Sequence, residues 1–168
     1  FKRFGRPKLG FLVSAGNIDS MVAHYTAAKR KRSDDAYSPG GKAGKRPDRA
    51  VIIYAQMAKK AYPDVPVIIG GLETSLRRFA HYDYWDDKVR RSLLLDAKAD
   101  LLLYGMGEKI IIEVADALNA GIAVEDLVYI RGSVWKTKDL SRAYDYIMLP
   151  SYEEIVADKM TYAKSFNI

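Results

Sequence analysis

The segment "VPVIIGG" (residues 65–71) is a short apolar run that two glycines close. An apolar run without polar alternation is typical of a strand that is buried on both faces of a sheet. Two further runs have the same form, "LGFLVSAG" (9–16) and "ADLLLYG" (99–105). The runs "DLVYIRG" (126–132) and "YDYIMLP" (144–150) also predict strands, which gives five in all.

Helical periods lie between these runs. A first helix, which Asn17 could cap, would place four apolar residues on one face: Ile18, Met21, Val22 and Tyr25. A second helix is predicted at 48–61, with Pro47 in its first turn and an apolar first half, "AVIIYA", that suggests burial on more than one side.

Two more helices are predicted farther along the chain. One covers 86–97, where Asp86 and Asp87 would lie at the positive end of the helix dipole. The other ends at Gly121 and has a continuous apolar face: Ile110, Ile111, Val114, Ala115 and Leu118.

Strands that alternate with helices predict a doubly wound α/β fold, Rossmann-like or flavodoxin-like, with a mainly parallel sheet covered on both faces. The connection "SVWKTKDLSRAYD" (133–145) is short for a crossover helix, so an antiparallel edge strand is possible. We expect one domain over residues 1–150, and a helix or linker over 151–168 that leads to a further domain.

Composition excludes several classes of protein. No apolar run approaches the roughly 20 residues that cross a bilayer, so we expect a cytoplasmic protein with no membrane partner. Without cysteine, these residues provide no thiolate ligand or nucleophile, and two histidines are too few for a His-rich metal site. We therefore expect no metal site within the chain.

Positive charge is concentrated in residues 29–49, named here the basic segment. It has eight Lys or Arg against three Asp, a net charge of +5, and the whole chain has +6. Such a run is often only a solvated face, but it can also attract phosphate, nucleic acid or an acidic surface. The stretch "SPGGKAGKRPDRA" (38–50) supplies the candidate donors Lys42, Lys45, Arg46 and Arg49, and close backbone approach at Gly40, Gly41 and Gly44.

The long connection "GGLETSLRRFAHYDYWDD" (70–87) holds the second group of candidates. Its aromatic residues could anchor the connection by burial, or form a binding surface beside a titrating histidine. Gly70 and Gly71 would allow close backbone approach. The candidate binding side chains are Glu73, Arg77, Arg78, His81, Tyr82, Asp83, Tyr84 and Trp85.

The turn "GMGEK" (105–109) gives the third group. A dinucleotide fingerprint fails there, because Ile110 takes the third glycine position and Glu108 would face a pyrophosphate. In the separate basic stretch 38–50, the P-loop pattern also fails, since Arg46 stands where Ser or Thr should hold magnesium. In one interpretation, Gly105 and Gly107 make a tight strand-to-helix turn, and Glu108 interacts favourably with the dipole of the helix that follows. In the other, Glu108 binds a ligand or a neighbouring domain.

Three long blocks resemble the N-terminal domain of the YgiQ-type radical SAM proteins. The first block opens with "SAGNIDSMVAHYTAAKRKR" (14–32) and the second with "VPVIIGGLETSLRRFAHYDYW" (65–85). The third block is "LPSYEEIVADK" (149–159). The resemblance implies an accessory domain before a radical SAM barrel, with the cluster-binding cysteines farther along the parent protein. It also implies a four-iron, four-sulfur cluster and S-adenosylmethionine in that parent, but not in this chain.

The blocks are more distantly similar to cobalamin-binding domains, but no D-x-H-x-x-G loop occurs, so cobalamin is not expected. We expect the basic segment, residues 72–85 and the turn at 105–108 to cover the mouth of the downstream barrel and help admit a substrate that the sequence does not identify. No catalytic residue is assigned, and whether this part acts as an enzyme stays open. The alternative is a nucleic-acid- or phosphate-binding module that uses residues 29–49 and 79–87.

Overall fold

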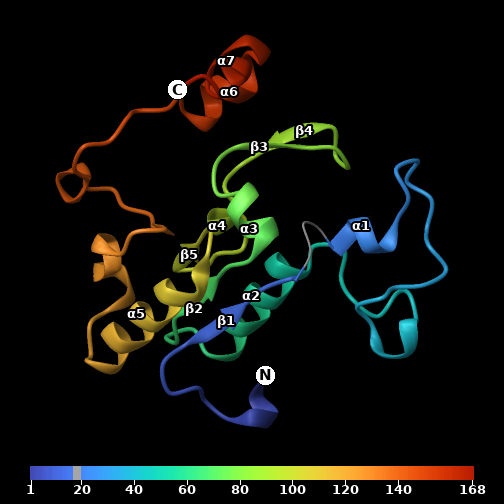
Figure 1. The fold of residues 1–168 in the computed structure, drawn as a ribbon, viewed down its shortest axis with the longest axis horizontal. Coiled ribbons are helices and arrows are strands. Elements are labelled where there is room, and N and C mark those ends of the chain that lie inside the picture. Colours follow the sequence, from blue (N-terminus) through green and yellow to red (C-terminus); the bar gives the residue numbers. More distant parts are fainter. Residues whose placement is uncertain (17–19) are drawn as a thin grey trace.

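The computed structural model describes residues 1–16 and 20–168, with a four-stranded sheet at its centre (Figure 1). The strands lie in the order β1 (Phe11–Val13), β2 (Val67–Ile69), β5 (Leu101–Leu103) and β6 (Ser133–Val134). The first three are parallel, and β6 runs antiparallel to β5. This confirms the predicted mainly parallel sheet with an antiparallel edge.

Strand β2 lies inside the sheet and is buried along its whole length. Its central residue, Ile68, pairs with Leu12 on one side and with Leu101 on the other. Successive side chains of a strand point to opposite faces. Accordingly, Val67 and Ile69 belong to one hydrophobic cluster, and Ile68 belongs to a second.

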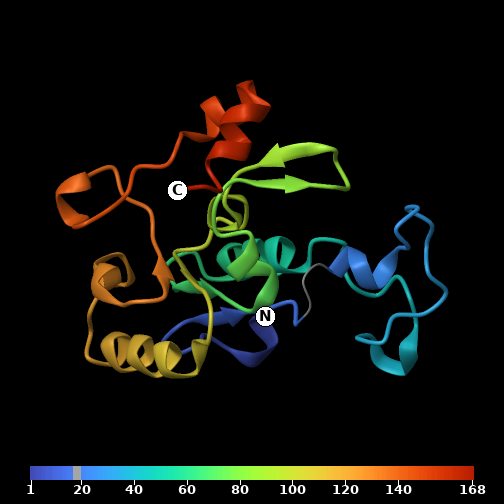
Figure 2. The same cartoon turned by 45° about the horizontal axis from the view of Figure 1, so that its top comes forward.

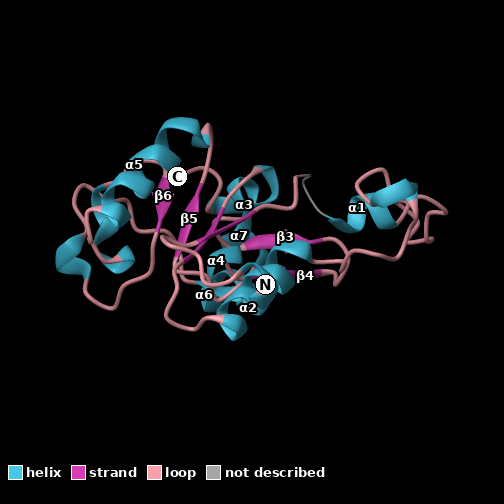
Figure 3. Ribbon diagram, turned by 90° about the horizontal axis from the view of Figure 1, so that it is seen from below, coloured by secondary structure: helices cyan, strands magenta, loops and turns pink. Residues whose placement is uncertain are grey.

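Helices cover both faces of the sheet, which confirms the doubly wound fold. On one face α2 (Ala50–Ala61) and α4 (Leu93–Asp96) pack on Val67 and Ile69. On the other face α5 (Gly107–Asn119) and the 3₁₀ helix η3 (Val124–Tyr129) pack on Ile68. Figure 3 shows α5 and α2 on either side of the strands. None of the helices in the described ranges combines the length and apolar character that crossing a bilayer requires.

The remaining elements lie around this centre (Figures 1 and 2). The antiparallel hairpin of β3 (His81–Asp83) and β4 (Lys88–Arg90) lies beside the C-terminal helices α6 (Tyr152–Ala157) and α7 (Lys159–Lys164). Helix α1 (Ser20–His24) and the basic segment extend to the end of the molecule opposite α5. The short helices are η1 (Lys2–Phe4), η2 (Pro39–Gly41), α3 (Leu72–Leu76) and η4 (Leu140–Arg142).

Two predicted strands are wrong. Residues 126–132 are not a strand, because Leu127 within η3 and Ile130 directly after it pack beneath α5. The edge strand follows at Ser133 instead. Residues 144–150 have no regular structure, and Tyr144 and Ile147 are 85% and 72% exposed. Burial within this chain therefore does not explain why residues 144–150 are apolar.

The predicted helix at 86–97 is also wrong. Asp86 and Asp87 lie in the turn of the hairpin, where Asp87 has φ 49°, and only Leu93–Asp96 are helical. Ser92 caps that short helix, because its hydroxyl accepts a hydrogen bond from the Leu94 N–H.

The other predicted helices are confirmed with changes. Helix α2 begins at Ala50, so Pro47 precedes the helix rather than lying in its first turn. In α1 Met21 is buried, but Val22 is exposed, so the predicted common face is only partly correct. Asn17 and Ile18 lie outside the described residues. Helix α5 agrees with the prediction, and Gly121 follows its end with φ 86°.

Replacing the buried Leu102 with alanine should lower the free energy of unfolding by about 2–5 kcal/mol, because it leaves a cavity in the middle of the sheet. The matched control is Leu12→Ala in the same sheet, where the side chain is 63% exposed and the loss should be below about 1 kcal/mol. Urea unfolding of both variants measures the difference. Equal losses would contradict the assigned faces of the sheet.

Candidate functional site

A cleft opens where the three parallel strands end, and we name it the sheet-edge cleft. Its volume is about 450 Å³. Ligands of open α/β sheets bind at this carboxyl edge, because the loops there are free to differ from the scaffold. The lining residues are Leu12, Val13, Ser14, Ile68, Ile69, Gly70, Gly71, Leu103, Gly105, Gly107, Glu108 and Ile111.

Glycine is required at the centre of the cleft. Gly71 has φ 95°, and a Cβ atom built there would lie 2.5 Å from the hydroxyl oxygen of Ser14. Gly105 has φ 73°, and its N–H donates a hydrogen bond of 3.1 Å to the hydroxyl of Ser75. These contacts bring the loops after β1, β2 and β5 against one another. Exposed backbone therefore forms much of the cleft wall.

Glu108 lies at the rim of the cleft, in the first turn of α5. A carboxylate at this position interacts favourably with the helix dipole. The floor, by contrast, is apolar, with Leu12, Ile68 and Ile111. The cleft therefore suits an uncharged or cationic group better than a pyrophosphate.

The aromatic residues of the hairpin turn contact the start of the basic segment. The rings of Trp85 and Tyr25 lie 4.4 Å apart between centroids. The ammonium of Lys29 donates to the Trp85 carbonyl at 2.9 Å and lies over the Trp85 and Tyr84 rings. Tyr84 also donates its hydroxyl to the Ala27 carbonyl at 2.7 Å. These contacts anchor the hairpin on the segment after α1.

Arg49 joins the hairpin to α2. It precedes the first residue of that helix, and its guanidinium donates to Asp83 at 2.5 Å and to Asp86 at 3.1 Å. Burial raises the pKa of Asp83, but the hydrogen bond from Arg49, with those from the Asp86 and Trp85 N–H groups, holds that pKa below its ordinary value. Asp83 is therefore a permanent anion at neutral pH.

His81 lies in a different environment. It is 9% exposed, its Nδ1 lies 3.1 Å from the Phe79 carbonyl, and burial lowers its pKa. The ring is therefore uncharged at neutral pH. It lines a second, larger hollow of about 1,010 Å³, which lies between α4, the segment after β6 and the C-terminal helices. We name this hollow the apolar groove.

The predicted basic donors differ in their surroundings. Arg46 is held by Asp35, with hydrogen bonds of 2.8 and 2.9 Å to its two carboxylate oxygens. Lys42 and Lys45 are exposed. Gly40, Gly41 and Gly44 have positive φ and would meet nothing within 4 Å if a Cβ were added. Of the predicted donors, Arg46 and Arg49 therefore bind carboxylates of the chain itself, and Lys42 and Lys45 face solvent.

The candidates from residues 70–87 are divided among these sites. Glu73 is buried and pairs with Arg77 at 3.4 Å. The guanidinium of Arg78 lies over the rings of Phe79 and Tyr104 and borders the apolar groove. Tyr82 is half exposed and donates to Asp87 at 2.6 Å. The predicted residues thus form a cleft, a hairpin anchor and a groove rather than one cluster.

Sequence reasoning missed Ser14 and Ser75, whose hydroxyls contact the cleft glycines. It also missed the pair of His24 and Asp48, whose Nδ1 and Oδ1 atoms lie 2.8 Å apart. A serine near the end of the predicted strand 9–16 was the available signal for Ser14. No spacing rule links His24 to Asp48, because the basic segment folds back before they meet.

Arg49→Gln should cost about 3 kcal/mol in the free energy of unfolding, because it leaves the buried Asp83 without its main partner. The control is Arg91→Gln, whose side chain is 56% exposed and lies 3.8 Å from Asp96. This control should change stability by less than about 1 kcal/mol. Chemical denaturation followed by tryptophan fluorescence measures both. A small effect of Arg49→Gln would show that the hairpin is anchored by its aromatic contacts instead.

Acid should destabilise the fold through Asp35 and Asp83. The pKa of Asp35 is held low by its hydrogen bond from Arg46, and that of Asp83 by Arg49 against the effect of burial. Their folded-state pKa values lie below the ordinary value of 3.8, so their contribution is complete above that pH and is lost as the pH falls below it. Urea midpoints measured on both sides of this pH should show the decline. Arg49→Gln should make the decline shallower, and an unchanged slope would contradict the assignment for Asp83.

A doubly wound, mainly parallel sheet with a glycine-lined cleft at its carboxyl edge is the arrangement of a Rossmann-like α/β domain. The sequence model of the family described as "Radical SAM N-terminal" matches residues 1–168, and the chain belongs to that family. This confirms the membership that the three sequence blocks predict.

Curated relatives are similar over the whole chain but are much longer. A UPF0313 protein of Clostridium botulinum (strain ATCC 19397 / Type A) is 58% identical over 168 residues. One from Clostridium perfringens (strain ATCC 13124) is 54% identical over 169 residues. Each alignment covers 100% of this chain and 26% of the relative, so the chain spans about a quarter of their length. No solved structure matches the chain significantly.

Proposed function

We propose that this chain is the N-terminal accessory domain of a radical SAM enzyme, and that it docks on the downstream catalytic region through its apolar groove. The family match together with the length of the relatives supports this role: about three quarters of each relative lies outside the matched part. A domain of this kind needs a surface for the rest of its chain.

Exposed apolar side chains are the observation that carries the proposal. Soluble monomers rarely expose large contiguous apolar patches, and such patches mark interaction sites. Residues 144–168 hold eight large exposed apolar side chains, each at least half exposed: Tyr144, Tyr146, Ile147, Met148, Val156, Met160, Phe166 and Ile168. Three of them, Ile147, Phe166 and Ile168, also line the apolar groove.

The groove itself has the character of a protein interface. Its walls include Phe79, Leu95 and Trp135, and Arg78, Arg91 and Lys136 border them. An apolar centre with arginine and aromatic residues is the composition that tight interfaces favour. The occupant that we propose is the downstream region of the same polypeptide, because a neighbour in the same chain is present at high effective concentration.

In this arrangement the sheet-edge cleft is the part of the domain that contacts the substrate. We propose that Ser14, Glu108 and the exposed backbone of Gly71 and Gly105 contact a part of the substrate that does not react, near the mouth of the downstream barrel. In this proposal the basic segment and the hairpin form one side of that mouth. The reaction and the identity of the substrate are not assigned.

In this proposal the iron-sulfur cluster and S-adenosylmethionine belong to the downstream region. The chain contains no cysteine to supply thiolate ligands. Within the described residues, no three His, Asp or Glu side chains are grouped to hold a metal ion. The residues present therefore do not fit the cluster, and no chemical step is assigned to it here. We expect the whole protein to be cytoplasmic.

Docking can be tested with Ile147→Asp and Phe166→Asp. Both residues are mostly exposed, so the variants should keep the stability of residues 1–168 but weaken association with a separately expressed downstream region by roughly tenfold or more. The matched control is Ile112→Asp on α5, where the side chain is 62% exposed and does not line the groove. Sedimentation velocity measures the association.

The control should bind within about twofold of the unchanged domain. Loss of binding in all three variants alike would point to a general effect of added charge. If the two regions do not associate at all, docking through the groove is wrong.

A further inference from the structure

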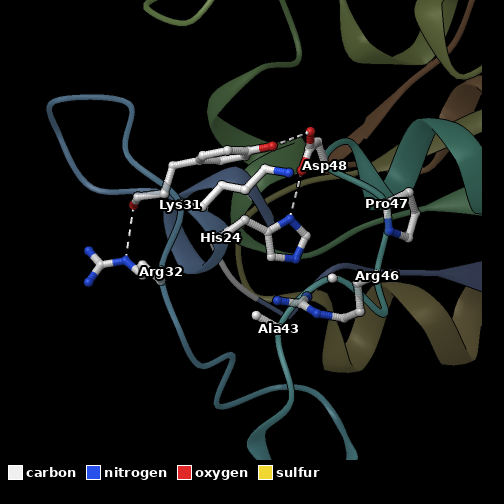
Figure 4. Close-up of a pocket in the computed structure, with 9 residues that line it drawn as sticks. His24, Lys31, Arg32, Ala43, Arg46, Pro47 and Asp48 are labelled. Carbon is white, nitrogen blue, oxygen red and sulfur yellow. Dashed lines mark hydrogen bonds and ion pairs between the residues drawn. The ribbon is translucent and has the colours of Figure 1, made fainter.

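A third cavity lies in the lobe that α1 and the basic segment form, away from the sheet (Figures 1 and 4). Its volume is about 290 Å³, close to the lower limit of small-molecule sites. We name it the histidine cavity. Its lining residues are His24, Tyr25, Lys31, Arg32, Ala43, Gly44, Arg46, Pro47 and Asp48.

Asp48 fixes the orientation of His24. One carboxylate oxygen, Oδ1, lies 2.8 Å from Nδ1 of His24, and the other accepts a hydrogen bond of 3.0 Å from the Tyr25 hydroxyl. The Ser20 hydroxyl donates to the Asp48 carbonyl, which ties the backbone at this point to α1. Both oxygens of Asp48 are therefore engaged, and the opposite nitrogen of the imidazole is left for another partner (Figure 4).

That nitrogen, Nε2, makes no hydrogen bond to any described residue, although the His24 side chain is only 7% exposed. Asp35 Oδ2 lies 3.4 Å away. The oxygens of Asp35 already accept hydrogen bonds from Arg46, the Ser38 hydroxyl and the Tyr37 N–H. Buried polar atoms without a partner are rare in folded proteins, and they often mark the place of a ligand.

Cationic side chains surround the cavity. Lys31 is exposed and forms no ion pair with the described residues, and its ammonium group lies beside His24 and Asp48 in Figure 4. Arg32 points outward, with its Nε donating to the carbonyls of Val22 and Tyr25. The basic segment as a whole carries a net charge of +5. The cavity lining thus includes three cationic side chains, Lys31, Arg32 and Arg46, and one carboxylate, that of Asp48.

We propose that the histidine cavity binds a phosphate group. Lys31 provides a charge-assisted hydrogen bond, and Nε2 of His24 either donates to a phosphate oxygen or accepts from a protonated one. Arg46 also lines the cavity wall, but its charge is paired with Asp35, so the ammonium of Lys31 supplies the available positive charge. The predicted donors Lys42 and Lys45 do not line the cavity. This site goes beyond the docking role and does not depend on it.

Titration calorimetry of the full-length protein with inorganic phosphate tests the site. Lys31→Gln should weaken phosphate binding by about tenfold, because it removes a charged donor that forms no ion pair with residues 1–16 or 20–168. The matched control is Lys45→Gln, which removes the same charge from the same segment outside the cavity and should change affinity by less than about twofold. Both lysines are exposed, so both variants should fold.

Imidazole nitrogen NMR gives a second measurement. Phosphate should shift the Nε2 signal that His24→Gln removes from the spectrum. The proposal is overturned if phosphate does not bind saturably, if Lys31→Gln and Lys45→Gln weaken it equally, or if the Nε2 signal does not move. It is also overturned if single-stranded RNA binds the basic segment and phosphate does not compete, since that result favours a nucleic-acid track. Phe166→Asp should leave phosphate affinity unchanged, which separates this site from docking.

Discussion

The burial of β2 on both of its faces is the constraint on which the rest of the molecule depends. Val67, Ile68 and Ile69 have no solvent-facing side, so each face of the sheet must be covered by a different helix layer. Parallel neighbours on both sides then bring the ends of β1, β2 and β5 to the same edge. The sheet-edge cleft is the direct consequence, because the loops that leave this edge contain glycine and stay close to the backbone.

A second constraint is electrostatic and acts at the outer lobe. Arg46 binds Asp35, and Arg49 binds Asp83 and Asp86. These ion pairs neutralise two of the positive charges of the basic segment. They also hold the segment and the hairpin in place. What stays available is a smaller set of exposed lysines and one buried imidazole nitrogen. The paired arginines thus have a structural role, and the exposed lysines are available to bind a ligand.

Residues 144–168, at the C-terminal end of the chain, combine well-formed helices with little apolar burial. Helices α6 and α7 are well capped: Ser151 and Glu154 form a capping box, and Asp158 accepts from the N–H groups of Met160 and Thr161. Yet only Ile155 of this region is a buried large apolar residue. Local capping determines the helices, while their apolar faces find little to pack on within residues 1–168. This is the physical basis for assigning the surface to the downstream region.

Local sequence alone predicted the three parallel strands and α5, because their apolar side chains are the ones that the sheet and its helix layers bury. It also located the long connections that follow these strands. Tertiary structure decided the rest: Leu127 packs from a 3₁₀ helix, Asp86 pairs with arginines in a hairpin, and residues 144–150 form no strand. It alone brought His24 to Asp48, 24 positions apart. These outcomes depend on which distant groups neutralise a charge or cover an apolar side chain, and such long-range contacts leave no periodic pattern in the sequence.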